Sequence, residues 1–133
     1  MEQSTLQRGL IDTDILVDAS RGVTQAGEFL NEALSQTGVT VSIISAMELM
    51  TGCRNAKQLR DIKRTISLFT VLPITELISL RARAFMEAYT LSHGLLIPDA
   101  LVAATAFESG IALYTRNVRH YKMIPNLLII QPY

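Results

Sequence analysis

Short runs of β-branched and apolar residues alternate along this chain with longer stretches in which apolar residues recur at helical spacing. Residues 39–44 form the clearest run, and such a composition is typical of a buried strand. The predicted strands cover residues 6–12, 39–44, 71–74, 111–114 and 127–130. The predicted helices cover residues 13–20, 24–36, 45–52, 55–68, 75–93 and 98–109, with a helical turn at 117–121. Strands that alternate with helices predict an α/β domain around a mostly parallel sheet.

Several helices have an apolar side that suggests how they pack. In residues 24–36 this side consists of Ala26, Phe29, Leu30, Ala33 and Leu34. In residues 55–68 it consists of Leu59, Ile62 and Ile66, and in the long helix 75–93 of Leu77, Leu80, Ala84, Ala88 and Leu91. We expect these sides to face the core, because helical amphipathicity usually marks the buried face.

The size and composition of the chain exclude several classes of protein. A length of 133 residues suits one domain, and 49% apolar with 18% charged residues exclude wholesale disorder. The single cysteine, Cys53, excludes an intrachain disulfide and a zinc site built from several thiolates. We expect a reduced, cytoplasmic setting. There is neither a signal-peptide pattern nor an apolar run of the roughly 18 residues that suggest a membrane span.

The formal net charge of zero hides an uneven distribution of charge. Residues 1–50 carry seven acids and two bases, whereas residues 51–133 carry five acids and ten bases. The two parts therefore have net charges of −5 and +5. A neutral total argues against a strongly basic nucleic-acid binder, but a functional interpretation has to account for this split.

Acids and their neighbours stand where predicted strands meet predicted helices. Each has an ordinary explanation: Ser45 and Glu48 have the spacing of a capping box, and Asp99 follows Pro98 in a first helical turn, where the helix dipole favours a carboxylate. Thr13 and Thr115 also stand at helix openings. Together, however, these positions converge on one edge of a parallel sheet. Clustered carboxylates favour a cation, and oxygen-only ligands favour Mg²⁺ or Mn²⁺ over zinc.

Four segments resemble the conserved motifs of the PIN-domain ribonucleases, in particular the VapC-type toxins of bacterial toxin–antitoxin pairs. They occur in the order and spacing typical of that family and span most of the chain. These segments are Leu10-Ile-Asp-Thr-Asp-Ile-Leu-Val-Asp18, Ser45-Ala-Met-Glu-Leu-Met-Thr-Gly52, Ile97-Pro-Asp-Ala-Leu-Val-Ala-Ala-Thr-Ala106 and Leu113-Tyr-Thr-Arg-Asn-Val-Arg-His-Tyr121. The resemblance implies a three-layer α/β/α fold, a single PIN domain over residues 1–133 and endoribonuclease activity that depends on Mg²⁺ or Mn²⁺. It also implies a homodimer and inhibition by a cognate antitoxin.

The same resemblance implies roles for individual residues. Asp12 and Asp99 would hold the metal, and Glu48 would complete the acidic cluster. Thr13 and Thr115 would orient ligands or the attacking water, with Asp14 secondary. The chain departs from the family at Asn117, where many relatives carry an acid. Its amide can offer an oxygen but no charge, so a second tightly bound metal is not expected.

Two basic stretches fit an RNA backbone beside the acidic cluster. Residues 54–64 hold five bases, among them Lys57 and Arg60, and residues 116–122 include Arg116 and Arg119. We expect these four side chains to contact substrate, since a nuclease needs cations for the phosphates as well as carboxylates for the metal. The alternative is a solvated helix face. Neither histidine is assigned a catalytic role.

The leading hypothesis is therefore a metal-dependent endoribonuclease of the toxin type. One alternative is a catalytically weak or silent PIN domain that binds RNA or a protein partner, which Asn117 motivates. Another is a structure-specific DNA nuclease, since relatives of this fold also cut DNA flaps.

Overall fold

A five-stranded sheet in which every strand pairs in parallel with its neighbours organises the computed structural model, which describes residues 5–133. Residues 1–4 of the domain predicted over residues 1–133 lie outside the described residues. The strand order is β3-β2-β1-β4-β5. The strands are β1 (Gly9–Ile11), β2 (Thr40–Ser42), β3 (Thr70–Leu72), β4 (Ala112–Tyr114) and β5 (Ile129–Ile130).

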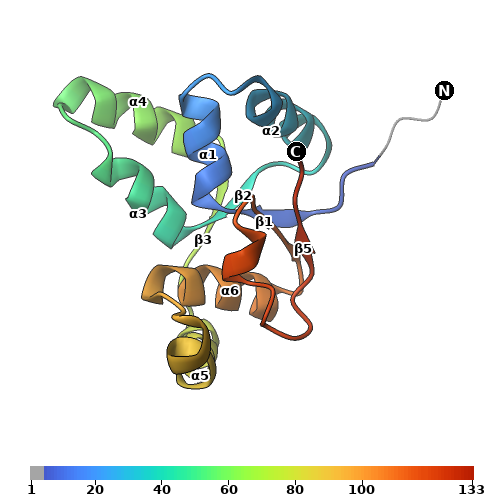
Figure 1. Cartoon of the computed structure of the whole chain (residues 1–133). Helices are drawn as coiled ribbons and strands as arrows, with labels where there is room; N and C mark the ends of the chain where they lie inside the picture. Colours follow the sequence, from blue (N-terminus) through green and yellow to red (C-terminus); the bar gives the residue numbers. More distant parts are fainter. Residues whose placement is uncertain (1–4) are drawn as a thin grey trace.

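Helices cover both faces of this sheet (Figure 1). One side carries α1 and α2, and the other carries α5 and α6, so the predicted three-layer α/β/α fold is confirmed. The helices are α1 (Thr13–Ser20), α2 (Thr24–Gln36), α3 (Ile43–Thr51), α4 (Ala56–Ile66), α5 (Glu76–His93) and α6 (Ile97–Ser109), followed by the short 3-10 helix η1 (Val118–His120). In the part of the chain that the structure describes, no helix combines the length and apolar character needed to cross a membrane.

Alternation along the central strands separates two hydrophobic cores. Leu10 and Leu113, which are register partners, pack with buried residues of α5 and α6. The next pair, Ile11 and Tyr114, packs on the opposite face with buried residues of α1 and α2. Because successive side chains of a strand point to opposite faces, three-residue strands buried on both sides are sufficient to form the middle layer.

The strand order places a topological switch point at the centre of the sheet. From β1 the chain continues through β2 to β3 on one side, and it then crosses over to β4 and β5 on the other side. In open parallel sheets, ligands bind outside the carboxyl ends of the strands at such a point. Asp12 follows β1 directly, and Thr115 follows β4 directly. The two strands that flank the switch point therefore both end in residues of the predicted site.

The predicted capping box at Ser45 is wrong, because the helix begins earlier. Ser42, the last residue of β2, is the N-cap of α3, and its hydroxyl accepts a hydrogen bond from the backbone N–H of Ile44 at 3.1 Å. Strand β2 is correspondingly shorter than the predicted 39–44. Ser45 is thus fully buried inside the first turn of α3, where its hydroxyl is free to contact α1 instead of capping a helix.

The packing side predicted for α5 is also wrong. The buried residues of α5 are Ile78, Ala82 and Phe85, whereas Leu77, Leu80 and Leu91 are 66%, 56% and 99% exposed. Both sides of this helix are apolar, so the sequence pattern does not distinguish them. Helix α4 has no fully buried residue, and Leu34 and Leu59 are also exposed.

Candidate functional site

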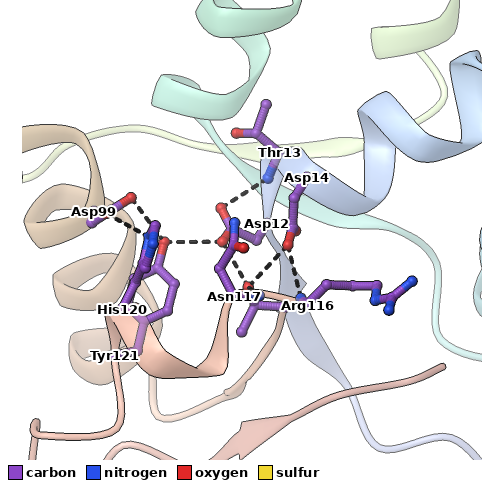
Figure 2. Close-up of polar contacts among 9 residues, drawn as sticks. Asp12, Thr13, Asp14, Asp99, Arg116, Asn117, His120 and Tyr121 are labelled. Carbon is purple, nitrogen blue, oxygen red and sulfur yellow. Dashed lines mark hydrogen bonds and ion pairs between the residues drawn. The ribbon is translucent and has the colours of Figure 1, made fainter.

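Asp12 occupies the junction between the central strand and the first helix. It is the N-cap of α1, and its Oδ1 accepts the backbone N–H of Thr13 at 2.8 Å. Its backbone N–H donates to the carbonyl of Tyr114 at 2.9 Å, which continues the pairing of β1 with β4. Only 6% of Asp12 is exposed. The residue is therefore held by the sheet and the helix together, with its carboxylate at the carboxyl edge of the sheet (Figure 2).

Thr115 connects the two aspartates of the first motif. Its fully buried hydroxyl lies 2.9 Å from Oδ2 of Asp12 and 3.3 Å from Oδ2 of Asp14. The same oxygen accepts the backbone N–H of Asn117 at 3.0 Å. The backbone N–H of Arg116 donates to Oδ2 of Asp14 at 2.8 Å. The turn after β4 is thus built around Asp12 and Asp14, which fixes the relative positions of the first and fourth motifs.

Tyr121 connects Asp12 to Asp99, which lies in the first turn of α6. Its hydroxyl is 2.9 Å from Oδ2 of Asp12 and 3.2 Å from Oδ1 of Asp99, and its side chain is fully buried. The other oxygen of Asp99, Oδ2, lies 3.2 Å from Nδ1 of His120. Figure 2 shows these side chains converging from α6, the end of β1 and the segment after β4.

Glu48 joins the site through Thr13. The hydroxyl of Thr13 lies 2.7 Å from Oε1 of Glu48 and 2.8 Å from the hydroxyl of Ser45. Both partners lie on α3, where Glu48 is exposed and Ser45 is fully buried. Ser45 therefore anchors the threonine from below while Glu48 extends from the rim of the site. Glu48 has no direct contact with Asp12 among these bonds.

Burial dominates the electrostatics of the site. It raises the pKa of Asp12 from 3.8 to about 6, with the nearby negative charge of Asp14 as the second cause. The three hydrogen bonds that Asp12 accepts act in the opposite direction, because they favour the charged form. Burial also raises the pKa of Asp14 and that of Tyr121, which Asp12 and Asp99 raise further. Tyr121 therefore remains a neutral phenol whose single O–H is shared between the two carboxylates.

The donor set has the chemistry that Mg²⁺ or Mn²⁺ requires. Asp12, Asp14 and Asp99 supply carboxylate oxygens, and a buried negative charge such as that of Asp12 favours a nearby cation. Within residues 5–133, no three Asp, Glu, His or Cys side chains form a common group that could hold a metal ion. The hydroxyls of Thr115 and Tyr121 each connect two of these carboxylates, and the hydroxyl of Thr13 connects Glu48 to Ser45. The residues fit such an ion in chemical type.

The predicted substrate-binding residues fall into two groups. Arg116 and Arg119 are exposed in the segment that carries the site hydroxyls, and the Arg116 guanidinium lies 4.7 Å from the ring centre of Tyr133, whose hydroxyl donates to Asp18 at 2.8 Å. Lys57 and Arg60 lie exposed on α4. Lys57 pairs with Asp61 of the same helix at 3.8 Å, not with a carboxylate of the site.

The backbone N–H of Asn117 donates to the hydroxyl of Thr115, and the side chain of Asn117 is exposed. Reasoning from the sequence missed Tyr121, His120 and Ser45 as parts of the site. The available signals were their places inside the motif segments 45–52 and 113–121 and, for Tyr121, a large aromatic residue one turn after Asn117. Nothing in the local pattern indicates that this residue would reach two aspartates on other elements.

Comparison with known proteins identifies the family to which this fold belongs. The family model of the PIN domain matches residues 9–124. Ribonuclease VapC10 of Mycobacterium tuberculosis is 37% identical over 119 residues, with 89% of each chain covered. Ribonuclease VapC19 of the same organism is 34% identical over 120 residues, which cover 89% of this chain and 95% of the relative.

A solved structure is similar in both fold and sequence. A chain from a toxin–antitoxin complex of Klebsiella pneumoniae superimposes with a TM-score of 0.78 at 29% identity, covering 95% of this chain and 98% of that one. All four motif segments lie within residues 9–124, which the family model matches. The chain therefore belongs to the PIN-domain family and, within it, to the ribonucleases of the VapC type.

Proposed function

We propose that this chain is a Mg²⁺- or Mn²⁺-dependent endoribonuclease that acts in the cytoplasm, as a single PIN domain, as the toxin of a toxin–antitoxin pair. The observation that carries the proposal is the bridge from Asp12 through Tyr121 to Asp99 at the switch point of the sheet. Relatives named as ribonucleases of the VapC type support the reaction class, and a structural relative from a toxin–antitoxin complex supports the biological role.

Asp12 and Asp99 would hold the metal ion in this proposal, with Glu48 and Asp14 completing the negative cluster. When bound, such an ion activates a water molecule as a nucleophile and offsets charge on the phosphodiester. The chain's own hydroxyls orient the carboxylates. Thr115 and Tyr121 hold Oδ2 of Asp12 from two sides, and Thr13 holds Glu48 at the rim. Because Tyr121 and Thr115 are fully buried, these orientations are set before substrate arrives.

Cations beside the carboxylates would hold the RNA strand. Arg116 and Arg119 belong to the same segment as Thr115 and Tyr121, so phosphates on either side of the scissile bond can pair with them. Lys57 and Arg60 lie on α4 and would contact a more distant part of the strand. This arrangement predicts that RNA affinity falls steeply with salt concentration.

The direct test is cleavage of single-stranded RNA by purified protein with Mn²⁺ or Mg²⁺. We expect the wild type to cleave and Asp99→Asn to lose activity by at least a hundredfold, because the variant removes one charged ligand. Glu28→Gln, a charge-neutralising change on α2 away from the site, is the matched control and should cleave normally. Equal activity of Asp99→Asn and wild type, or cleavage in excess EDTA, would contradict the proposal. Preference for flap DNA over RNA would favour the DNA nuclease.

An antitoxin is the protein partner that this role requires. A pocket of about 480 Å³ between α1, α3 and α4 is lined in part by Val17, Leu49 and Ile62, and it includes Glu48 of the site. An apolar segment bound there would reach a proposed site residue. The test is whether a small protein encoded beside this chain's gene inhibits RNA cleavage. If that protein binds but leaves cleavage unchanged, it is not the antitoxin.

We also propose a homodimer formed through α5. The exposed stripe of Leu77, Leu80, Ala84, Ala88 and Leu91 is centred on Ala84, so two copies of α5 packed antiparallel about a twofold axis would set Leu77 against Leu91 of the partner copy. Arg83 and Glu87 flank the stripe and pair with each other at 3.0 Å. In such a dimer Arg83 of one copy can equally pair with Glu87 of the other copy, and the reverse, as expected for an isologous interface.

A further inference from the structure

A small pocket of about 260 Å³ lies directly beside the proposed metal site. It is formed where α5 ends, α6 begins and η1 passes, and its lining consists of His93, Gly94, Leu96, Asp99, Arg119 and His120. Both histidines of the chain therefore line one pocket, although they are 27 residues apart in sequence. Asp99 belongs to this pocket and to the site.

Each of the two imidazoles is held by neighbouring side chains. His93 is exposed at the end of α5, where its Nδ1 lies 2.7 Å from the hydroxyl of Ser92 and its ring meets Tyr89 edge to face at 5.8 Å. His120 is tethered through Nδ1 to Asp99, and 42% of its side chain is exposed. The rings are thus oriented by neighbouring residues while part of each remains accessible.

The lining has the composition of a stacking site for a planar ring. Imidazole rings and a guanidinium provide flat surfaces, and Leu96, 61% exposed, provides an apolar one. Single-stranded RNA is recognised mainly by stacking of its bases on such side chains. The volume is below the roughly 300–1,000 Å³ of sites for drug-sized ligands, which suits one ring system and not a longer ligand.

Electrostatics favour a base over a phosphate as the occupant. The carboxylate of Asp99 lines the pocket, so in the protein without metal an anion placed there would face a negative charge as well as Arg119. A nucleobase is neutral and bears no such penalty. Because Asp99 is also a proposed metal ligand, RNA bound with its scissile phosphate at the site would bring the adjoining nucleotide to this pocket.

We propose that this pocket receives the nucleobase of the nucleotide next to the scissile phosphate and thereby determines the base preference of cleavage. The proposal rests on the proposed ribonuclease function. His93 and Leu96 are the residues specific to it, since both lie outside the site of metal and hydroxyl contacts.

The first test measures binding without cleavage. In EDTA, the two histidine ring signals of the wild type are followed by NMR during titration with each of the four ribonucleosides and, separately, with inorganic phosphate; the variant His93→Asn assigns the signals. We expect one or more nucleosides to shift both signals and phosphate to shift neither. Shifts with phosphate alone, or with none of these probes, would overturn the proposal, whether or not the protein proves to be a nuclease.

The second test measures cleavage of RNAs that differ only at the nucleotide next to the cut. His93→Ala and Leu96→Ala should each raise KM by about five- to a hundredfold, the range expected for the loss of one stacked base. They should also reduce the base preference and leave kcat close to that of the wild type. His93→Phe, which keeps a flat ring, should restore KM.

Leu68→Ala, at a 67% exposed leucine between α4 and β3, is the matched control and should change neither quantity. If the wild type is active and His93→Ala and Leu96→Ala keep a normal KM and base preference, the proposed role of the pocket is refuted. The proposed ribonuclease function would then still stand. An inactive wild type would refute the ribonuclease, and the nucleoside titration would still decide whether the pocket binds bases.

Discussion

Asp12 shows how a single residue combines a structural and a chemical role at some cost in stability. It caps α1, continues the β1–β4 pairing and is only 6% exposed to solvent. Three donors stabilise its charge, yet burial and Asp14 outweigh them, and the pKa rises to about 6. The fold therefore holds a charge that it would be more stable without.

The pH dependence of stability follows from this shift. Since the folded-state pKa of Asp12 lies above its ordinary value of 3.8, the stabilising effect of protonation is complete below that value and is lost as pH rises through about 6. We expect the free energy of unfolding, measured by urea in EDTA, to fall between pH 4 and pH 7. A shift of about two units corresponds to about 3 kcal/mol.

Asp12→Asn should remove most of that fall, because the amide is neutral and the hydroxyls of Thr115 and Tyr121 can reverse to accept from it. The variant should thus be more stable than the wild type at pH 7 and inactive on RNA. Asp61→Asn, which alters an exposed carboxylate on α4, should keep the wild-type slope. An identical slope in Asp12→Asn would mean that Asp12 is not the group responsible.

Tyr121 is the positioning residue whose loss should separate activity from folding. Tyr121→Phe keeps the buried ring and removes the hydroxyl that bridges Asp12 and Asp99. We expect kcat/KM on RNA to fall by roughly 10- to 100-fold, as for other groups that orient metal ligands. The acid limb of the pH profile should move to higher pH, because a bond that lowers the pKa of Asp12 is lost.

Tyr114→Phe provides the comparison for that experiment. Its hydroxyl also donates inside the fold, to the carbonyl of Gln7, but it contacts no carboxylate of the site. This variant should lose some stability and retain the wild-type pH profile. If both phenylalanine variants behave alike in activity and in pH dependence, Tyr121 acts only through the stability of the fold.

At the scale of elements, β1 depends on the close approach of its first residue to β4. A methyl group at Gly9 would lie 2.6 Å from the ring of Tyr114 and 3.0 Å from the carbonyl of Ala112. Both Tyr114 and Gly9 are buried, so the ring has little room to move. Position 9 therefore needs glycine, because there is no space for a side chain between β1 and the ring of Tyr114.

Gly9→Ala should therefore lower the free energy of unfolding by about 1–3 kcal/mol, the usual range for overpacking a core. Urea denaturation followed by circular dichroism measures the change. Gly27→Ala is the contrasting variant: it lies within α2, and nothing stands within 4 Å of the added methyl group. That variant should gain up to about 1 kcal/mol, as alanine favours a helix over glycine. An unchanged free energy of unfolding in Gly9→Ala would show that the ring of Tyr114 can move aside.

The elements also show what local sequence can predict. The alternation of strands and helices and the parallel sheet follow from nearby residues, because periodicity is local. The start of α3 does not, since Ser42 and Ser45 are both adequate caps and tertiary packing selects the first. The buried side of α5 does not either, because apolar residues lie on both sides of that helix.

The same distinction separates the parts of the candidate site. Asp12 and Thr115 follow strand ends, Asp99 lies in a first helical turn and Glu48 lies one turn into α3. Parallel topology brings such positions to one edge of the sheet. Tyr121 and the pocket between His93 and His120 depend on how α5, α6 and η1 pack. No spacing in the sequence encodes that packing, so these residues emerge only from the three-dimensional arrangement.

For the molecule as a whole, the neutral total charge conceals two regions of opposite charge. Acids of the first half, among them Asp12, Asp14 and Glu48, gather around the switch point. Bases of the second half include Arg116 and Arg119 in the segment next to them. With a divalent cation bound, much of the local negative charge would be offset, and the face proposed for RNA would be positive. Net charge alone is a poor guide to substrate here.

The proposed dimer makes a prediction at the same scale. Leu80→Glu places a charge in the exposed stripe of α5 without altering the buried face of that helix. We expect the wild type to have the mass of a dimer by light scattering and the variant that of a monomer, with unchanged circular dichroism. Leu68→Glu, at an exposed leucine outside the stripe, should remain dimeric. A dimeric Leu80→Glu would move the interface away from α5.

The wide sequence separation of the site residues has a consequence for synthesis of the protein. Asp12 meets Thr115 and Tyr121 across 103 and 109 residues of chain, and its own strand lies at the centre of the sheet. A growing chain on the ribosome carries Asp12 early but lacks its partners Thr115 and Tyr121 until residue 121 has emerged. Under the proposed function, a chain that ends before residue 121 lacks the bridge between Asp12 and Asp99 and should not cleave RNA.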